Sequence, residues 1–421
     1  MSSAPTTPSS PFAFPAFRAF FVAKLGSTLA QMLMVIVIGW QVYDLARNSM
    51  PMREAAFLLG LVGLAQFLPV FCLSLVVGVI ADRLDRRYIA RAAIVLELLC
   101  AVALAAFAAS GSTTLWPLFA VAVTLGVARA FASPSLSALA PNLVPSAVLP
   151  TAIAWNSIGW QIGAVLGPVV GGLAYDVSPP LPYTIASVLL SVSLVALFRI
   201  PPVKRPASSG ASGLESVKQG LRYVRGNQIV FGAISLDMFA VILGGATAML
   251  PIYARDILMV GPQGLGILRA APAFGAALVA LWLTRNPLGS RVGIKMFVNV
   301  GIFACATIVF GLSTIMWLSV AALAVLGAAD MVSVYVRSSL IQLHTPDAMR
   351  GRVSSVSMLF VSASNELGEF RAGTTAALFG AVEATVIGGA LALGVTMLWT
   401  RLFPELRDAD RLDVPDQLRS D

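Results

Sequence analysis

The sequence predicts an all-α polytopic membrane protein with twelve transmembrane helices arranged as two six-helix bundles. Two observations come from composition: hydrophobic side chains make up 58% of the 421 residues, and charged side chains only 11%. Soluble domains have roughly 45–50% apolar and about 25% charged residues. The third observation is that apolar runs of about 20 residues, the length of one helical crossing, recur from end to end.

In chain order, charged or Pro/Gly-rich breaks separate these runs into twelve predicted spans. The first six are 17–43, 55–81, 88–110, 115–139, 149–175 and 181–200. The second six are 229–254, 263–284, 292–314, 317–341, 352–379 and 381–402. The predicted organisation is an N-terminal bundle over 1–200, a linker over 201–226, a C-terminal bundle over 227–402 and a tail over 403–421.

The linker begins with Pro201 and Pro202 and ends with Lys218, Arg222 and Arg225, which is typical of a flexible connection followed by a short amphipathic surface helix. The tail, rich in Asp and Arg, is most simply a solvated, disordered end.

Lysine and arginine residues predict the orientation. About 20 of the 28 lie at the start of span one, in the loops after spans two, six, eight and ten, and in the tail. Only Arg47, Arg53 and Arg255 lie in loops on the other side. The positive-inside rule therefore places both termini and the linker in the cytoplasm, which requires an even number of spans.

The two halves of the chain repeat each other. A shift of 201 residues places Arg129 on Asp330, Gly167 on Gly368 and Gly172 on Gly373 without a gap. This register supports a 6+6 duplication, in which two repeats related by an axis along the membrane normal enclose a cavity near the bilayer midplane.

Composition also excludes several kinds of site. One histidine, His344, and three separated cysteines, Cys72, Cys100 and Cys305, cannot build a His/Cys metal cluster or a disulfide framework. The sequence has no G-x-x-x-x-G-K-[ST] loop for a nucleotide. We therefore expect no metal and no cofactor. The net charge of +8 reflects membrane topology, so no nucleic-acid partner is expected.

The loop after span two reads Gly78-Val79-Ile80-Ala81-Asp82-Arg83-Leu84-Asp85-Arg86-Arg87. It resembles the signature loop of the major facilitator superfamily in Gly78, Asp82, Arg83, Arg86 and Arg87, and departs from it at Asp85, where the family usually has Gly. The resemblance implies a cytoplasmic gate in which Asp82 meets the helix that begins Arg350-Gly351-Arg352. The alternative is a positive-inside loop that only fixes topology.

Span five carries Gly159, Gly163, Gly167 and Gly171 at four-residue spacing, with Pro168 and Gly172 beside them. Residues four apart share a helix face, so they form a ridge that another helix can approach closely. Pro168 removes a backbone donor and bends the helix. The string 163–172 is similar to the superfamily's antiporter motif, which implies export rather than uptake. Ordinary small-residue packing is the alternative.

Polar and charged residues within the spans are candidates for substrate binding or proton coupling, because charges in a bilayer are costly. The candidates are Lys24, Gln31, Arg129, Asp237, Arg269, Asp330 and Glu366. Further charged residues within spans are Glu97, Arg337, Glu369 and Arg371. Asp237 and Glu366 are the preferred coupling acids. Each candidate also has a structural alternative as half of an interhelical ion pair.

The runs 349–356 and 365–373, which read MRGRVSSV and NELGEFRAG, look like the enterobactin exporter group within the same superfamily. The resemblance covers essentially the whole chain and implies proton-driven export of catecholate siderophores or drugs from the bacterial cytoplasm. An anionic catecholate would suit Lys24, Arg129 and Arg269, whereas a cationic drug would suit Asp237 and Glu366. The sequence leaves both substrate classes open.

We therefore expect a monomeric secondary transporter in the bacterial inner membrane, with both termini cytoplasmic, that exports a small organic molecule by proton antiport and alternating access. Its expected partners are the small-molecule substrate, protons and the lipid bilayer. Proton-coupled uptake and a non-transporting, receptor-like role are the alternatives. A membrane-embedded enzyme is disfavoured, because one histidine and scattered acids provide no clustered nucleophile or metal ligands.

Overall fold

The computed structural model of the chain describes residues 10–202 and 213–410. Within these ranges, the side chains of 74–76, 78–83, 138, 141, 146, 213, 214, 216, 347 and 348 lie outside the description. All regular secondary structure in the described ranges is helical. The predicted all-α class is therefore confirmed.

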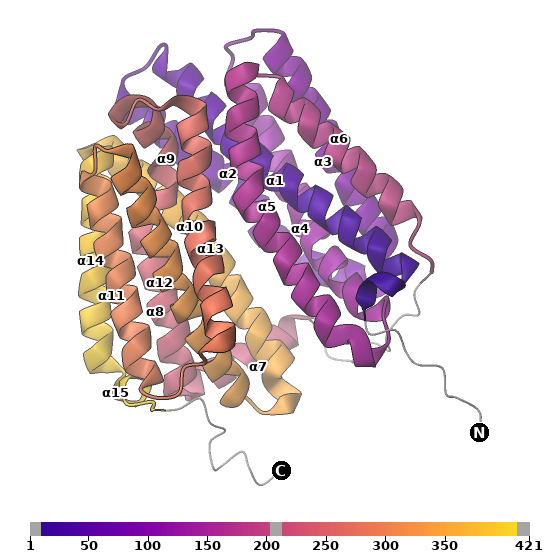
Figure 1. The fold of residues 1–421 in the computed structure, drawn as a ribbon, viewed down its shortest axis with the longest axis vertical. Helices are drawn as coiled ribbons and strands as arrows, with labels where there is room; N and C mark the ends of the chain where they lie inside the picture. The colour runs from indigo at the N-terminus through magenta and orange to yellow at the C-terminus, as the bar shows by residue number, and fades with distance from the viewer. Residues whose placement is uncertain (1–9, 203–212, 411–421) are drawn as a thin grey trace. The chain divides into compact units, whose positions relative to one another are not determined.

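The first half of the chain forms six long helices (Figure 1): α1 Pro15–Arg47, α2 Met52–Arg83, α3 Arg86–Ala109, α4 Trp116–Leu139, α5 Leu149–Val177 and α6 Leu181–Phe198. The second half forms α7 Gly213–Gly226, α8 Gln228–Gly244, α9 Leu250–Ile252, α10 Gly261–Arg285, α11 Val292–Leu312, α12 Met316–Leu343, α13 Asp347–Phe379, α14 Ala381–Leu402 and α15 Pro404–Arg407. Short 3-10 turns cover Pro11–Ala13, Ala140–Asn142, Ser146–Val148 and Ala246–Met249, and a π-helical turn covers Tyr253–Ile257.

Eleven of the described helical segments are long and apolar enough to cross a membrane, counting Gln228–Ile257 as one. The remaining predicted span, 352–379, falls within α13, whose 33 residues give it sufficient length. Its serine-rich middle carries Glu366, Glu369 and Arg371, which makes it the most polar of the long helices. A helix with such charges belongs next to other helices or a cavity rather than lipid.

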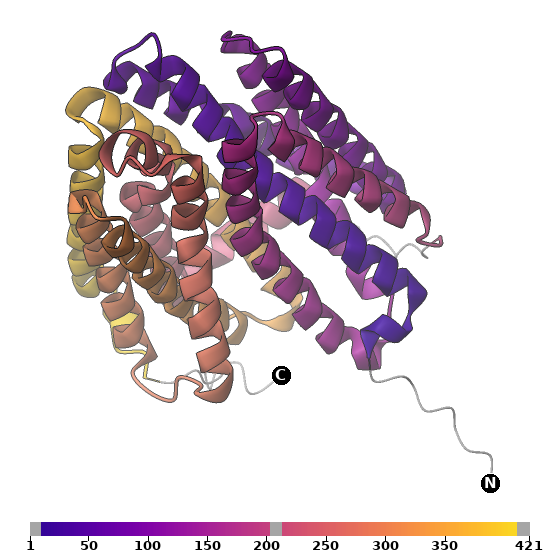
Figure 2. The same cartoon turned by 45° about the horizontal axis from the view of Figure 1, so that its top comes forward.

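Contacts divide the chain into two compact units. The first comprises Met1–Ile38 and Leu68–Ser209, and the second comprises Gly39–Phe67 and Gly210–Asp421. The end of α1 and the first half of α2 therefore pack with the second half of the chain. In the first unit, α3 packs against α4 and α6, and Figure 2 shows α1 and α5 side by side. In the second unit, α12 packs against α10 and α11, and α8 packs against α13 and α14.

The predicted seventh span, 229–254, corresponds to the membrane-length segment Gln228–Ile257, but the helix is interrupted within this segment. Helix α8 ends at Gly244, and Gly245 has φ 7° and ψ 29°, outside the helical region. The chain continues through the 3-10 turn Ala246–Met249, α9 and the π-helical turn. Local sequence permits the interruption, because each glycine costs about 1 kcal/mol relative to alanine in a helix and Pro251 supplies no backbone donor.

The amphipathic surface helix expected at the end of the linker is α7. Its apolar residues Val217, Leu221 and Val224 pack with Val353 and Val356 of α13. This contact places α7 along the first turns of α13, the helix that begins near Arg350.

The interpretation of the tail as a disordered end is wrong for its first part. Residues 404–407 form α15, and Leu406 is fully buried. The backbone nitrogen of Arg291 donates to Oδ1 of Asp410 at 3.0 Å, and that of Gly293 donates to the carbonyl of Ala409 at 3.0 Å. These bonds satisfy N–H groups at the start of α11, which have no partner within the helix.

Candidate functional site

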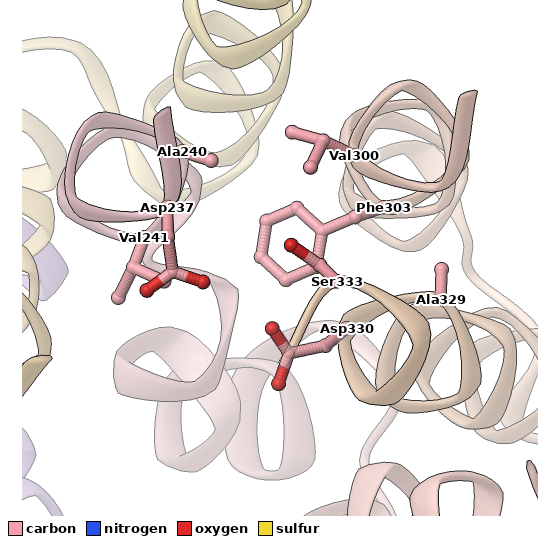
Figure 3. A pocket seen from close by; sticks show the side chains of 8 residues that line it. All are labelled: Asp237, Ala240, Val241, Val300, Phe303, Ala329, Asp330 and Ser333. Atoms are coloured by element: carbon pink, nitrogen blue, oxygen red, sulfur yellow. The ribbon is translucent and has the colours of Figure 1, made fainter. Parts of the chain in front are cut away.

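A buried ion pair joins α8 to α12 in the second unit. Nη1 of Arg337 lies 2.9 Å from Oδ2 of Asp237, and the two side chains are only 7% and 6% exposed. Asp330 precedes Arg337 by two turns on the same side of α12. The carboxylates of Asp237 and Asp330 border one cavity, as Figure 3 shows. We call Asp237, Asp330 and Arg337 the acid cluster.

The cavity beside the acid cluster is small and mostly apolar. The two carboxylates share its lining with Ala240, Val241, Val300, Phe303, Ala329 and Ser333. Its interior has room for about one water molecule. Nε of Arg337 and Oγ of Ser333 are buried and have no hydrogen-bond partner among the described residues. Of these two residues, Ser333 lines the cavity, so its hydroxyl could bind a water there.

The charges of the acid cluster do not balance. If both carboxylates were ionised beside the one guanidinium, the cluster would carry a net charge of −1 in a buried, apolar setting. Uncompensated buried charge is costly, and one added proton makes the cluster neutral. The adjoining cavity is too small for an organic substrate.

A second buried carboxylate lies in the first unit. Glu97 of α3 is fully buried. It accepts hydrogen bonds from Nε2 of Gln31 at 2.6 Å and Oγ of Ser27 at 3.4 Å, both on α1. Lys24 of α1 and Arg129 of α4 interact with it electrostatically. The structure thus brings together three predicted site residues, Lys24, Gln31 and Arg129, around an acid that was noted but not selected from the sequence. Its position within the apolar run 88–110 was the available signal.

Two other predicted residues lie outside the acid cluster. Nη2 of Arg269 on α10 lies 3.8 Å from Oε1 of Glu369 on α13, and its Nη1 donates to the carbonyl of Thr247 at 3.3 Å. Glu366 of α13 is half-buried and does not line the cavity described above. Of the two preferred coupling acids, Asp237 therefore belongs to the acid cluster and Glu366 does not.

The glycine ridge of α5 packs against α1. A Cβ at Gly163 would lie 2.5 Å from Cγ2 of Thr28, and a Cβ at Gly167 would lie 2.6 Å from Cβ of Met32. The other ridge residues, Gly159, Pro168, Gly171 and Gly172, are buried too. No side chain fits at these contacts, so the absence of side chains is what lets the two helices approach.

The signature loop is described only in part. Gly78, Asp82 and Arg83 lie outside the residues whose side chains are described. Asp85, the departure from the family pattern, caps α3: its Oδ1 accepts a bond of 2.9 Å from the backbone nitrogen of Arg87. Its Oδ2 also lies 2.7 Å from Nη2 of Arg87, which is buried.

The remaining residues of the predicted gate lie at helix starts. Arg86 is half-buried at the beginning of α3. On α13, Nε of Arg350 donates to the carbonyl of Gln342 at 3.0 Å, and Nη1 of Arg352 lies 3.2 Å from Sδ of Met349. These contacts are all local, and the gate itself stays a prediction.

A charged cluster that the sequence did not indicate joins the end of α1 to the π-helical turn. Nε of Arg47 lies 3.1 Å from Oδ2 of Asp256, to which the Tyr43 hydroxyl also donates. Nε of Arg255 lies 2.8 Å from Oδ1 of Asp44. Arg47 and Asp256 are 209 residues apart in the sequence, so no local pattern reveals the pair. These contacts attach the end of α1 to the second unit.

We expect Asp256→Asn to loosen the end of α1, because it removes the charge that pairs with Arg47 and weakens the acceptor of Tyr43. Losing charge-assisted hydrogen bonds worth about 1.5–3 kcal/mol should raise hydrogen exchange at residues 44–50 by roughly tenfold or more. Mass spectrometry of the exchanged protein measures this. The control is Glu54→Gln, at an exposed position near the start of α2. Unchanged exchange in Asp256→Asn would show that these ion pairs do not hold α1.

Sequence comparisons match nearly the whole chain to one family. A family described as transmembrane secretion effector matches residues 6–419. The enterobactin exporter EntS of Escherichia coli O1:K1 / APEC is 26% identical over 344 residues, covering 81% of this chain and 80% of the exporter. The enterobactin exporter EntS of Citrobacter koseri is 25% identical over 395 residues, covering 93% of each chain.

Solved structures share the fold. A POT family transporter in complex with 5-aminolevulinic acid superposes with a TM-score of 0.72 at 13% identity, covering 93% of this chain and 97% of that one. A D-xylose-proton symporter superposes with a TM-score of 0.70 at 15% identity, covering 92% and 98%. At these identities the likeness concerns the fold alone, which is that of the major facilitator transporters.

Proposed function

Because the chain belongs to the transmembrane secretion effector family of the major facilitator superfamily, a family of transporters rather than enzymes, we propose that it exports a small organic molecule in exchange for protons. The exported molecule is siderophore-like or drug-like, since the matched exporters carry enterobactin in their name. The chain lies in the bacterial inner membrane with both termini in the cytoplasm.

The acid cluster is the observation that supports proton exchange. Asp237 and Asp330 line a cavity with room for about one water, and Arg337 pairs with Asp237, so two acids share one cation and can bind a proton but no organic substrate. Protonation of Asp237 would remove the charge that pairs with Arg337 and would weaken the link between α8 and α12. A proton taken up on one side of the membrane can therefore shift the balance between two conformations, and the proton gradient supplies direction.

The test is substrate accumulation in cells that express the full chain, with a catechol and a cationic dye as probes, before and after a protonophore collapses the gradient. We expect one probe to accumulate less in expressing cells, and the difference to vanish on collapse. Accumulation that rises with expression would indicate uptake instead. A receptor-like role is indicated if expression changes the accumulation of neither probe, and if replacing the acid cluster leaves the protein's effect on the cell unchanged.

A further inference from the structure

The interruption after α8 lies beside two arginines. Nη2 of Arg371 on α13 donates to the carbonyl of Leu243, the residue before the terminal glycine of α8, at 2.6 Å. Nη1 of Arg269 on α10 donates to the carbonyl of Thr247, in the 3-10 turn, at 3.3 Å. Backbone at a break in a membrane helix is tolerated where it lies against protein or a cavity, and here two guanidinium groups cover it.

Glycines make the contact with Arg371 possible. A Cβ at Gly388 of α14 would lie 2.3 Å from the Leu243 carbonyl and 3.0 Å from Nη2 of Arg371. A Cβ at Gly245 would lie 3.3 Å from the same nitrogen. The guanidinium of Arg371 therefore reaches the end of α8 through space left by two missing side chains.

The charges at this break have the opposite sign to those of the acid cluster. Arg269 and Arg371 carry two positive charges, and Glu369 compensates one of them across a distance of 3.8 Å. Arg371 has no ion-pair partner among the described residues, and its Nε is buried without a hydrogen bond. A guanidinium within a membrane span normally pairs with an acid or faces a functional site. The carbonyl end of α8 compensates Arg371 only in part, which leaves positive charge at the break for a ligand to compensate.

The side chains at the break after α8 are more exposed than those of the acid cluster. The side chains of Arg269 and Glu369 are 26% and 28% exposed, whereas those of Arg337 and Asp237 are 7% and 6% exposed. Arg269 therefore has side-chain surface that a ligand can contact, whereas Asp237 has almost none.

We propose that Arg269 and Arg371, at the break after α8, bind an anionic group of the exported molecule. This inference rests on the proposed export function and specifies its substrate class as a small organic anion with carboxylate or catecholate oxygens. Two neighbouring oxygens match the paired N–H donors of a guanidinium. The anion competes with Glu369 for Arg269 and supplies the acceptor that Arg371 Nε does not have.

Helix α8 connects the anion site to the acid cluster. Asp237 precedes Leu243 by six residues, or roughly 9 Å along the helix. A shift of α8 when Asp237 takes up a proton therefore moves the carbonyl that holds Arg371. Proton uptake at one end of this segment then alters anion binding at the other, which is the coupling that antiport requires.

The test uses the purified full chain in detergent for binding and in proteoliposomes for transport. The probes are 2,3-dihydroxybenzoate, an anionic catechol, and ethidium, a cationic dye. Three variants are compared with the wild type: Arg371→Gln, whose amide can still donate to Leu243, Arg371→Lys and Arg269→Gln. The matched control is Arg285→Gln, at the exposed end of the same helix as Arg269. Gel filtration and thermal unfolding establish that each variant is folded.

We expect Arg371→Gln and Arg269→Gln to raise the Kd and the KM for 2,3-dihydroxybenzoate by roughly tenfold or more, since each loses charge-assisted hydrogen bonds. Arg371→Lys should lose less, because it keeps the charge without the paired donors. Arg285→Gln should bind like the wild type.

Contrary outcomes distinguish the anion site from the proposed export function. Equal Kd in the wild type and both Gln variants, or a wild type that exports only ethidium, overturns the anion site and leaves export standing. A wild type that does not bind 2,3-dihydroxybenzoate at millimolar concentration also overturns the site. Arginine-dependent binding without gradient-driven transport supports the site and contradicts the export function.

Discussion

Arg337→Met is expected to lower the free energy of unfolding by about 3–5 kcal/mol and to abolish proton-driven export. The variant removes the only guanidinium of the acid cluster and leaves the carboxylates of Asp237 and Asp330 facing one small, apolar cavity. Two buried carboxylates without a cation are much less stable than the paired arrangement. Thermal unfolding of the purified protein and proton-driven export in proteoliposomes measure the two effects.

A triple variant separates stability from coupling. Asp237→Leu and Asp330→Leu combined with Arg337→Met replace all three charges of the acid cluster with apolar side chains, and such replacements are often neutral or stabilising. We expect this protein to unfold near the wild-type temperature but to transport without dependence on the proton gradient. If Arg337→Met alone keeps both wild-type stability and gradient-driven export, the acid cluster is not the proton site.

Gly167→Leu is expected to give a second large effect, the loss of folded, active protein. The new Cβ would lie 2.6 Å from Cβ of Met32, 3.1 Å from the carbonyl of Leu29 and 3.2 Å from the backbone nitrogen of Leu33. Two of these three neighbours are backbone atoms of α1, which no change of rotamer can move. Overpacking usually costs about 1–3 kcal/mol, and a leucine wedged between two helix backbones should exceed that range.

The matched control for this variant is Gly394→Leu on α14. A Cβ at Gly394 meets nothing within 4 Å, so the same substitution in another long helix should be tolerated. Yield of monodisperse protein and its unfolding temperature report the outcome for both variants. A Gly167→Leu protein as stable and active as the control would refute the close packing of α5 on α1.

The helices could be predicted because the signal for a membrane span is local. Apolar runs bounded by charges gave α14 with the same limits, 381–402, as the structure. The break after α8 was missed because the residues on both sides of Gly244 and Gly245 are equally apolar. Two glycines interrupt a span only where the surrounding side chains stabilise the break. Here one of those side chains is Arg371, which belongs to a helix far along the chain.

The charged residues of the site could be selected from the sequence, but not their partners. Asp237 and Arg337 are 100 residues apart, and Glu97 and Gln31 are 66 apart. A charge in an apolar run indicates that a partner exists without indicating which one. The acid cluster and the pairing of Gln31 with Glu97 therefore required the fold.

The contact between Asp410 and α11 has a consequence for synthesis of the chain. The first N–H groups of α11 donate to Ala409 and Asp410, which lie far downstream in the sequence. The ribosome therefore completes α11 well before it completes the residues that cap this helix. Until then, water or lipid headgroups at the bilayer surface must accept hydrogen bonds from these N–H groups. A purification tag should therefore follow residue 410, since truncation before it would leave α11 in that immature form.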